Sequence, residues 1–533
     1  MDDHFNALLN NYGTFSFDGS KTGNALADFM MGLPRSMNQD APITKYNNGW
    51  YYAAFAQDDF RIHPRLTLNL GLRYDVQTPF TDPYDRQLTF VQRVQSTKVP
   101  SAPPGLLFPG DPGVTRGIVK ADKNNFAPRV GVAWDPLGDG KTSVRAAAGV
   151  FFGSISANEW NQSTDFQPFS ARQQYTNVKS LTDPYGNFPG GVSPYPYIYS
   201  PTNPKLLPDA AITGIALDFR WPYTYQLNFS IQRQVTADLS LTAAYVGALG
   251  HAWPTIRDIN YPIYGPGATA ANVNDRRPIE PQPHTYSAIS IIQSVVNTAY
   301  HGLQLSAEKR ASRHYTFKGY YTFSKALEGA NEAAANGNTG IQDATKLNLE
   351  KGRTNTDRRH NFVMSTIWNI DYFNGSSPVL RGVLNHWVLS GIITARSGAP
   401  FTVTSGRDNN LDGNNTDRAN LIGNPRLDSN RSRSDVTKMW FNVAAFGQNA
   451  AGQPGTSGRN ILDKPGSKNV DLGFFRDFSI SEHKTLQFRC EVTNTFNLVN
   501  LRGPNTTLTS SAFGTIREAE SMRQVQLGLR FTF

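Results

Sequence analysis

The sequence predicts an all-β fold, an antiparallel transmembrane β-barrel of about fourteen strands with long extracellular loops and short periplasmic turns. Three observations predict it: apolar and polar residues alternate along many segments, short and long connections follow one another, and aromatic residues are frequent. Alternation is the period of a strand that has one apolar and one polar face. A barrel wall in a membrane needs this pattern because lipid covers only its outer face.

Three segments show the alternation most clearly. Over residues 66–76 every even position is apolar or aromatic, and every odd position is small, polar or charged. Residues 486–493 and 525–533 repeat the scheme. The side chains that we expect to face lipid are Leu68, Leu70, Leu72, Phe488 and Leu529, and those expected in the lumen are Asn69, Arg73, Asp75, Arg489, Glu491 and Arg530.

The connections between the predicted strands alternate in length. Short turns are expected at 63–65, 135–141, 236–238, 311–314 and 481–484. Long stretches rich in Gly, Pro and Asn separate these hairpins at 79–125, 154–222, 250–299, 326–359, 398–467 and 497–521. Short turns at one rim and long loops at the other are typical of outer-membrane barrels, whereas a soluble β-sandwich has no reason to sort its loops in this way.

The order of the connections also sets the strand count. It gives about thirteen strands from Tyr51 onward, and residues 14–17 supply a fourteenth. Residues 287–295 alternate as well, but as a separate strand they would place two long loops on opposite rims. We therefore interpret them as part of a loop or as an extension of the next strand. Residues 22–34 predict one short helix, which would lie in a loop.

Composition excludes several other classes of protein. Charged residues make up 17% of the 533-residue chain, below the roughly 25% of soluble domains, while aromatic residues reach 12%. No run approaches the ~18 apolar residues of a membrane-spanning helix, and the mean hydropathy is −0.43. The net charge of +9 comes from scattered Lys and Arg, so nucleic acid is not an expected partner. The single cysteine, Cys490, excludes an intrachain disulfide.

Several short motifs occur in a fixed order along the chain. The segments FAQDDF (55–60) and LTLNLGLRY (66–74) form one predicted hairpin. They are followed by YYTFSK (320–325), DRRHNF (357–362), WVLSGI (387–392), SGAPF (397–401), GRN (458–460) and FN (496–497). Together they resemble the barrel of TonB-dependent outer-membrane receptors, closest to the large branch with an N-terminal carboxypeptidase-regulatory-like module. The resemblance implies a bacterial outer-membrane location and a complete barrel of about twenty-two strands.

The resemblance also implies parts and partners that these residues do not contain. Family members carry a signal peptide, a TonB box and a globular plug before the barrel, and residues 1–533 match none of those parts. We therefore interpret the chain as the C-terminal part of such a barrel, with the signal peptide, plug and first strands absent. The implied partners are outer-membrane lipid, the TonB complex through an N-terminal region outside this chain, the barrel assembly machinery and an unknown large solute.

The function that the resemblance implies is uptake of a scarce, large solute, which loops capture and a TonB-driven plug admits. A surface interaction or adhesion barrel and a passive porin are the alternatives, because polar lumen residues name no solute. An enzyme is not expected. The sequence contains no GxSxG, GxxxxGK[ST] or HExxH motif and no GxGxxG after a strand, and its nine His residues lack ligand spacing.

One predicted loop contains a candidate calcium site. Asp408, Asn410 and Asp412 fill positions one, three and five of a DxNxDG calcium loop, and the following glycine permits its sharp turn. Ala419 stands where such loops have a bidentate Glu, and Asp417 could substitute for it. The alternative is an Asx-rich hydrophilic loop without a cation. Apart from calcium at this loop, no cofactor is expected.

The last strand contains a candidate assembly signal. Phe531 and Phe533 share the apolar face of Leu527 and Leu529, and the final aromatic resembles the signature that the barrel assembly machinery reads in its clients. The alternative is an ordinary last strand. Aromatic residues near predicted strand ends, as interfacial girdles require, are Trp50, Tyr51, Trp134 and Trp221.

Overall fold

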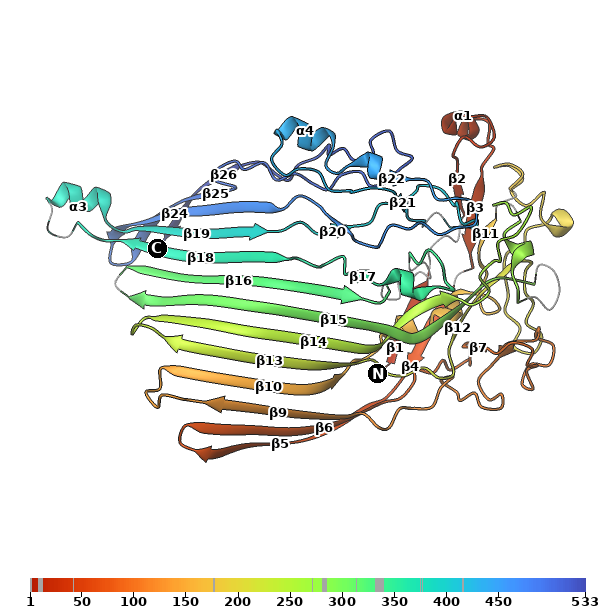
Figure 1. The fold of residues 1–533 in the computed structure, drawn as a ribbon, viewed down its shortest axis with the longest axis horizontal. Coiled ribbons are helices and arrows are strands. Elements are labelled where there is room, and N and C mark those ends of the chain that lie inside the picture. The colour runs from red at the N-terminus through yellow and green to blue at the C-terminus, as the bar shows by residue number, and fades with distance from the viewer. Residues whose placement is uncertain are drawn as a thin grey trace.

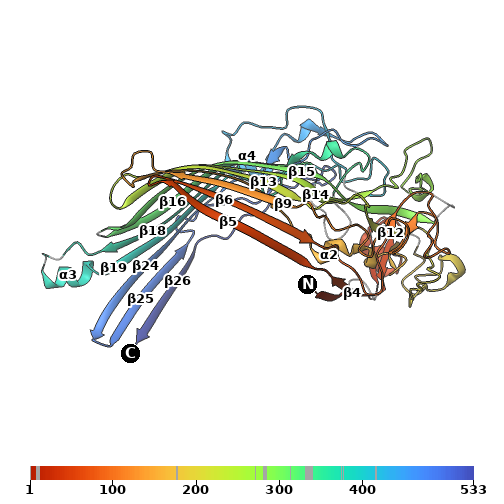
Figure 2. The same cartoon turned by 90° about the horizontal axis from the view of Figure 1, so that it is seen from below.

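One large antiparallel sheet, curved into a trough, dominates the computed structural model (Figures 1 and 2). Short turns lie at one end of its strands, and the long loops gather at the other end (Figure 1). The structure describes residues 2–7, 13–41, 43–175, 178–270, 272–279, 285–312, 314–330, 340–373, 375, 377–414 and 417–533.

Thirteen wall strands follow one another in chain order, as predicted from Tyr51 onward. Two further strands join the sheet at its loop end: β12 (Ala210–Ile215) runs parallel to β15, and β17 (Gly352–Arg353) pairs with β16. The wall strands are β5 (Tyr51–His63), β6 (Leu66–Gln77), β9 (Phe126–Trp134), β10 (Thr142–Phe152), β13 (Tyr223–Gln234), β14 (Leu239–Asp258), β15 (Tyr286–Ser312), β16 (Tyr315–Glu328), β18 (His360–Ile370), β19 (Trp387–Arg396), β24 (Ser467–Ser481), β25 (Lys484–Thr493) and β26 (Gln524–Thr532). Residues 287–295 belong to β15, so the predicted extension of that strand is confirmed.

The strand register places the predicted apolar side chains on one face of the wall. Leu70 lies opposite Val130, and Phe488 lies opposite Leu529. Leu70 is 45% exposed and Leu529 is 73% exposed, so neither is packed against a second protein layer. An exposed apolar face of this kind is what lipid covers in an outer-membrane barrel.

The opposite face of the same strands is polar. Asn69 donates to Asp59, and Arg73 forms an ion pair with Asp75 at 2.8 Å. Near the other edge of the wall, Gln487 lies opposite Arg530 and donates to Asp477 at 2.7 Å. The predicted division of the strands into an apolar and a polar face is therefore confirmed.

Aromatic side chains lie near both ends of the wall strands. At the loop end Trp50 stacks on Tyr52 with ring centroids 6.2 Å apart, and at the turn end Trp134 is 48% exposed. These positions suit interfacial girdles. Tyr51 points to the polar face instead, where its hydroxyl donates to Asp75 at 2.5 Å.

A short helix, α3 (Pro378–Leu384), lies at the turn end between β18 and β19 (Figure 1). Its N-cap Ser377 accepts a hydrogen bond from the Leu380 amide, and its carbonyls at Gly382 and Val383 accept from Arg476. No described helix is both long and apolar enough to cross a membrane.

The segment before β5 does not join the wall. β2 (Thr14–Ser16) pairs with β3 (Ser36–Asp40), which pairs with β11 (Arg172–Tyr175) in a separate sheet. The prediction that residues 14–17 form a fourteenth barrel strand is therefore wrong. A strand of three residues cannot span the ~9–11 residues that a tilted membrane strand requires. The predicted helix is confirmed as α1 (Ala25–Met30).

The other described elements are short and belong to the loop end. They are the strands β1 (Asp2–Ala7), β4 (Ile43–Asn48), β7 (Thr89–Phe90), β8 (Leu106–Leu107), β20 (Pro400–Phe401), β21 (Asn420–Leu421), β22 (Phe446–Gly447) and β23 (Leu462–Asp463), the helices α2 (Ala157–Trp160) and α4 (Arg433–Lys438), and the 3-10 helices Gln162–Asp165, Pro189–Gly191, Asn274–Arg276, Leu347–Glu350 and Val443–Ala445.

The wall has two edges. Among the described strands, β5 pairs only with β6 and β26 only with β25, and the two edges lie apart in Figure 2. Each edge therefore presents a row of backbone N–H and C=O groups that no wall strand satisfies.

The face assignment can be tested with two neighbouring residues of β15. Leu303 lies on the apolar face opposite Phe323, and Gln304 lies on the polar face opposite Thr322. We expect Leu303→Arg to lower the free energy of unfolding by about 2–4 kcal/mol, because it places a charge in lipid. Gln304→Arg should lower it by less than about 1 kcal/mol. Denaturant titration of the complete protein in lipid vesicles measures both, and equal losses would contradict the assignment.

Candidate functional site

The loop end is a packed assembly with its own apolar core. One buried cluster joins residues from distant loops, among them Phe80, Trp160, Trp221 and Ile292. Trp221 is 3% exposed, and its indole N–H donates to Gln77 Oε1 at 2.9 Å. The expectation that Trp221 belongs to an interfacial girdle is therefore wrong, because contacts between distant loops enclose it.

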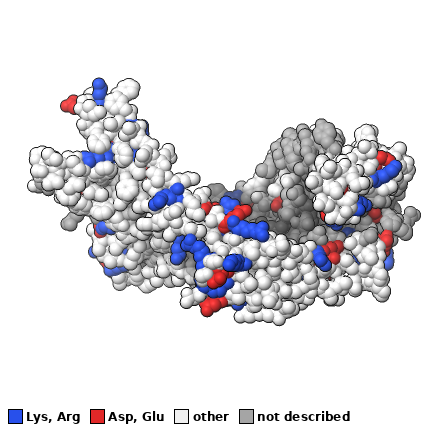
Figure 3. Space-filling view, turned by 90° about the horizontal axis from the view of Figure 1, so that it is seen from above, with Lys and Arg blue, Asp and Glu red and all other residues white. Residues whose placement is uncertain are grey.

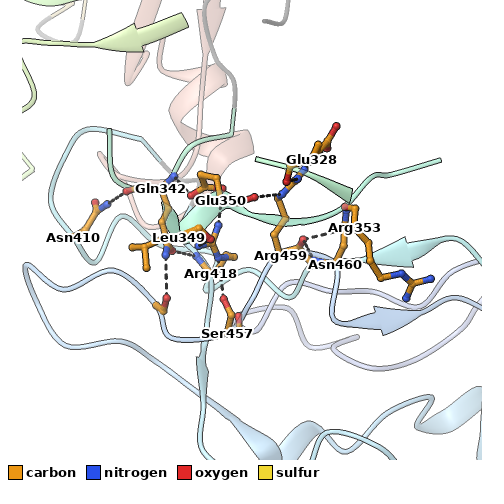
Figure 4. Close-up of polar contacts among 12 residues, drawn as sticks. Glu328, Gln342, Leu349, Glu350, Arg353, Asn410, Arg418, Ser457, Arg459 and Asn460 are labelled. Carbon is orange, nitrogen blue, oxygen red and sulfur yellow. Dashed lines mark hydrogen bonds and ion pairs between the residues drawn. The ribbon is translucent and has the colours of Figure 1, made fainter. Parts of the chain in front are cut away.

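A buried ion pair ties three segments from two loops together beside a second apolar cluster, to which Ala419 belongs. The Arg418 guanidinium lies 2.8 Å from the Glu350 carboxylate, and their side chains are 4% and 1% exposed. Arg418 also donates from Nε to the carbonyl oxygen of Ser457 at 2.9 Å and from Nη2 to that of Leu349 at 3.0 Å (Figure 4). These charge-assisted contacts fix the three segments relative to one another.

A second arginine joins the same cluster to the wall. Arg459 donates from Nε to the carbonyl oxygen of Glu350 at 2.8 Å, and its Nη1 lies 2.5 Å from the carboxylate of Glu328. Glu328 is the last residue of β16. Asn460, the residue after Arg459, donates to the carbonyl oxygen of Arg353 at 2.7 Å (Figure 4). These contacts fasten the loops to the loop end of β16.

Motifs that are far apart in the sequence meet around this cluster. Asp357 of the DRRHNF motif accepts from the Ala326 amide at 2.7 Å, beside the end of β16. Gly398 of the SGAPF motif packs closely against the backbone of Lys464. A Cβ at this position would lie 1.6 Å from the Lys464 carbonyl oxygen, so a residue with a side chain cannot fit there. The GRN motif supplies Arg459 itself. These motifs hold the loops against the wall.

The predicted calcium loop lies at the edge of the same assembly. Asp408 accepts from the amides of Asp412 at 3.0 Å and Gly413 at 2.9 Å. Asn410 Oδ1 accepts from the Asp412 amide, and Asp417 Oδ2 accepts from the Asn410 amide at 2.8 Å. These hydrogen bonds link the four predicted ligand residues, and calcium binding there stays a prediction.

Two carboxyl groups of this loop are buried. Asp412 is 3% exposed and Asp417 is fully buried. Burial raises the pKa of Asp412 to about 6, and burial also raises the pKa of Asp417. Among the described residues, no group of three or more His, Cys, Asp or Glu side chains is placed to share one metal ion.

The predicted assembly residues lie on the edge strand of the wall. Phe531 is 50% exposed and Phe533 is 89% exposed, and their rings stack with centroids 5.9 Å apart. Both share the apolar face of Leu529, as predicted, and their role as an assembly signal stays a prediction.

The hollowed face of the molecule carries charges of both signs. Figure 3 shows Lys, Arg, Asp and Glu side chains interspersed near the hollow between the turn end and the loop end. The surface therefore identifies neither an anionic nor a cationic solute.

Sequence reasoning missed the buried ion pairs. Glu350 and Arg418 are 68 residues apart and lie in loops, where no periodic pattern marks a buried position. Only the GRN motif drew attention to Arg459.

Comparisons with known proteins agree with this architecture. A family model described as an outer membrane beta barrel domain matches residues 1–526. No curated protein sequence matches the chain.

Solved structures with a similar fold include three outer-membrane proteins. The outer membrane transporter YddB from Escherichia coli has a TM-score of 0.48 and 12% identity, over 93% of this chain and 47% of YddB. The siderophore receptor PiuA from Acinetobacter baumannii has a TM-score of 0.41 and 10% identity, over 94% of this chain and 44% of PiuA. The FrpB iron transporter from Neisseria meningitidis has a TM-score of 0.40 and 12% identity, over 92% of this chain and 46% of FrpB. The chain spans less than half the length of each.

The buried ion pair should be important for the stability of the loop assembly. We expect Arg418→Met to lower the free energy of unfolding by about 3–5 kcal/mol, because it leaves the Glu350 charge buried without a partner. The double variant Arg418→Met, Glu350→Gln should lose less free energy of unfolding than Arg418→Met alone, because it leaves no unpaired buried charge. The exposed pair of Arg502 and Glu518 is the control, and Arg502→Met should cost less than about 1 kcal/mol. Denaturant titration measures these losses, and equal effects of both Arg variants would contradict the role of burial.

Proposed function

The chain belongs to the outer membrane β-barrel domain family, and on that premise we propose that it takes up a scarce, large solute as part of a TonB-dependent transporter. The family and the two-faced wall place the chain in the bacterial outer membrane, as predicted. The observation that carries the proposal is the packed loop assembly at one end of that wall. Ordered loops on a rigid scaffold are where proteins position binding residues.

The loop assembly favours specific capture over passive diffusion. The buried pair of Arg418 and Glu350 and the apolar cluster around Trp160 give these loops a core of their own. A passive pore requires only a polar lumen of suitable width. Loops held by a buried core can present fixed side chains to one solute, because little entropy is lost when that solute binds.

The wall would be completed by strands outside residues 1–533. The edges of β5 and β26, which no described strand pairs with outside the wall, support this, because every backbone polar group in lipid requires a hydrogen-bond partner. In this proposal the chain is the C-terminal part of the barrel. A plug and the region that contacts the TonB complex belong to the rest of the protein, as the sequence resemblance implies.

The proposal predicts a nutritional phenotype. A strain that lacks the complete gene should grow poorly when one large solute is supplied at limiting concentration, and excess solute should restore growth. Deletion of TonB should reproduce the defect, because uptake against a gradient needs energy. Growth across a panel of limiting solutes measures both effects.

The alternatives give different results in the same strains. Unchanged growth on every solute together with lost attachment to cells or matrix would favour an adhesion barrel. Steady ion conductance of the purified complete protein in a planar bilayer would favour a passive porin. Either result would contradict active uptake.

We also propose that Phe533 contributes to assembly of the barrel. Loss of one exposed aromatic contact costs on the order of 1–3 kcal/mol, which a large barrel should tolerate. We nevertheless expect Phe533→Ser to reduce the amount of heat-modifiable barrel in outer-membrane fractions strongly, because the assembly machinery would fail to recognise the last strand. The control is Ile422→Ser in a loop, where the side chain is 68% exposed. Equal amounts of folded barrel in both variants would reduce Phe533 to an ordinary lipid contact.

A further inference from the structure

The Asp408–Asp417 loop lies where several loops of the assembly meet. Asn410 donates from Nδ2 to the carbonyl oxygen of Gln342 at 2.7 Å and to the hydroxyl of Tyr261 at 3.1 Å. Asn449 donates to the carboxylate of Asp417 at 3.4 Å. These contacts thus reach two other loops, at Tyr261 and Gln342, and a distant segment of the same long loop at Asn449; Tyr261 is 149 residues away from Asn410.

Two buried carboxylate oxygens in this loop form no well-aligned hydrogen bond. Asp412 Oδ1 accepts from the Asn414 amide at 2.7 Å, while its buried Oδ2 has only the nearby Tyr261 hydroxyl, outside good hydrogen-bond geometry. Asp417 Oδ2 accepts from the amides of Asn409 and Asn410, while its Oδ1 is buried without a partner. Each carboxylate therefore keeps one buried oxygen that forms no well-aligned hydrogen bond and has a lone pair for a ligand.

The charge of these carboxylates is not balanced by the protein. In the described part of the chain, no Lys, Arg or His forms an ion pair with Asp412 or Asp417, although elsewhere in the assembly Arg418 balances the buried Glu350. Transfer of a carboxylate out of water without a partner is strongly unfavourable, and a second one nearby adds repulsion. A bound cation would remove both penalties.

The chemistry of the site selects the kind of cation. The groups around it are carboxylates, side-chain amides, backbone carbonyls and the Tyr261 hydroxyl, so the donors are oxygen atoms. Calcium accepts six to eight such oxygens in flexible geometry and uses neutral carbonyls and water beside a few carboxylates. Zinc and copper favour nitrogen or sulfur, and magnesium demands a stricter octahedron.

We propose that these buried oxygens of Asp412 and Asp417 bind a calcium ion, with neutral oxygens of neighbouring groups and water as its other ligands. The ion fastens this segment to the loops of Tyr261 and Gln342 and to the Asn449 segment of its own loop, and so orders this side of the loop assembly. Asp408 holds the turn through its two backbone contacts and is a positioning residue. This inference does not depend on which solute the barrel takes up.

Calorimetry and thermal unfolding of the complete protein in detergent test the proposal, with calcium removed by a chelator and then restored. We expect binding with a dissociation constant on the order of 0.1–1 mM, as in extracellular calcium modules, and a higher unfolding temperature with calcium. Asp412→Asn and Asp417→Asn should each weaken binding by roughly tenfold or more. The control is Asp428→Asn, an exposed loop residue whose carboxylate also accepts a backbone amide, at 2.8 Å.

The behaviour without calcium separates a cation site from a merely structural role. In chelator, the Asp412→Asn and Asp417→Asn proteins should unfold at the same temperature as the unchanged protein or higher, because each loses an unbalanced buried charge. With calcium present, the unchanged protein should unfold at a higher temperature than either variant. An unchanged protein that does not respond to calcium, or variants that respond as it does, would overturn the proposal. Equal stabilisation by magnesium would overturn the assignment to calcium. None of these measurements involves the solute, so a failure here leaves the proposed uptake untouched.

Discussion

The structure depends on one constraint: a backbone N–H or C=O group in lipid must form its hydrogen bond within the protein. Antiparallel strand pairing satisfies this for the strands between the two edges, β5 and β26, and leaves the two faces free to differ. Leu70 and Leu529 can then face lipid while Asn69 and Arg530 face the lumen. The same constraint keeps irregular chain out of the hydrocarbon, so the connections lie at the two rims.

Above the membrane the loop end follows the rules of a soluble domain. Its stability comes from apolar burial around Trp160 and Trp221 and from buried charges such as Arg418 and Glu350. The wall supports it directly, because β15 has 27 residues, more than twice the ~9–11 that a membrane strand requires. The extra length projects into the loop assembly, where it pairs with β12. A rigid wall strand therefore continues into the region that we propose captures the solute.

Two kinds of buried charge occur within this assembly. Glu350 is balanced by an arginine, so its contribution is internal to the protein and independent of the medium. Asp412 and Asp417 pair with no cationic side chain in the described part of the chain, so the proposed calcium ion would balance them and would link the order of the loops to the calcium concentration outside the cell. Capture of a solute by ordered loops would then depend on the same ion.

Sequence alone determined the wall strands, their two faces and the rim at which each connection lies. It did so because alternation and turn residues are local properties that a membrane wall imposes on every strand. Tertiary structure decided that residues 14–17 leave the wall, that Trp221 is buried and that Glu350 meets Arg418. These outcomes depend on contacts between loops that are distant in the chain, and no period in the sequence records which distant loops will meet.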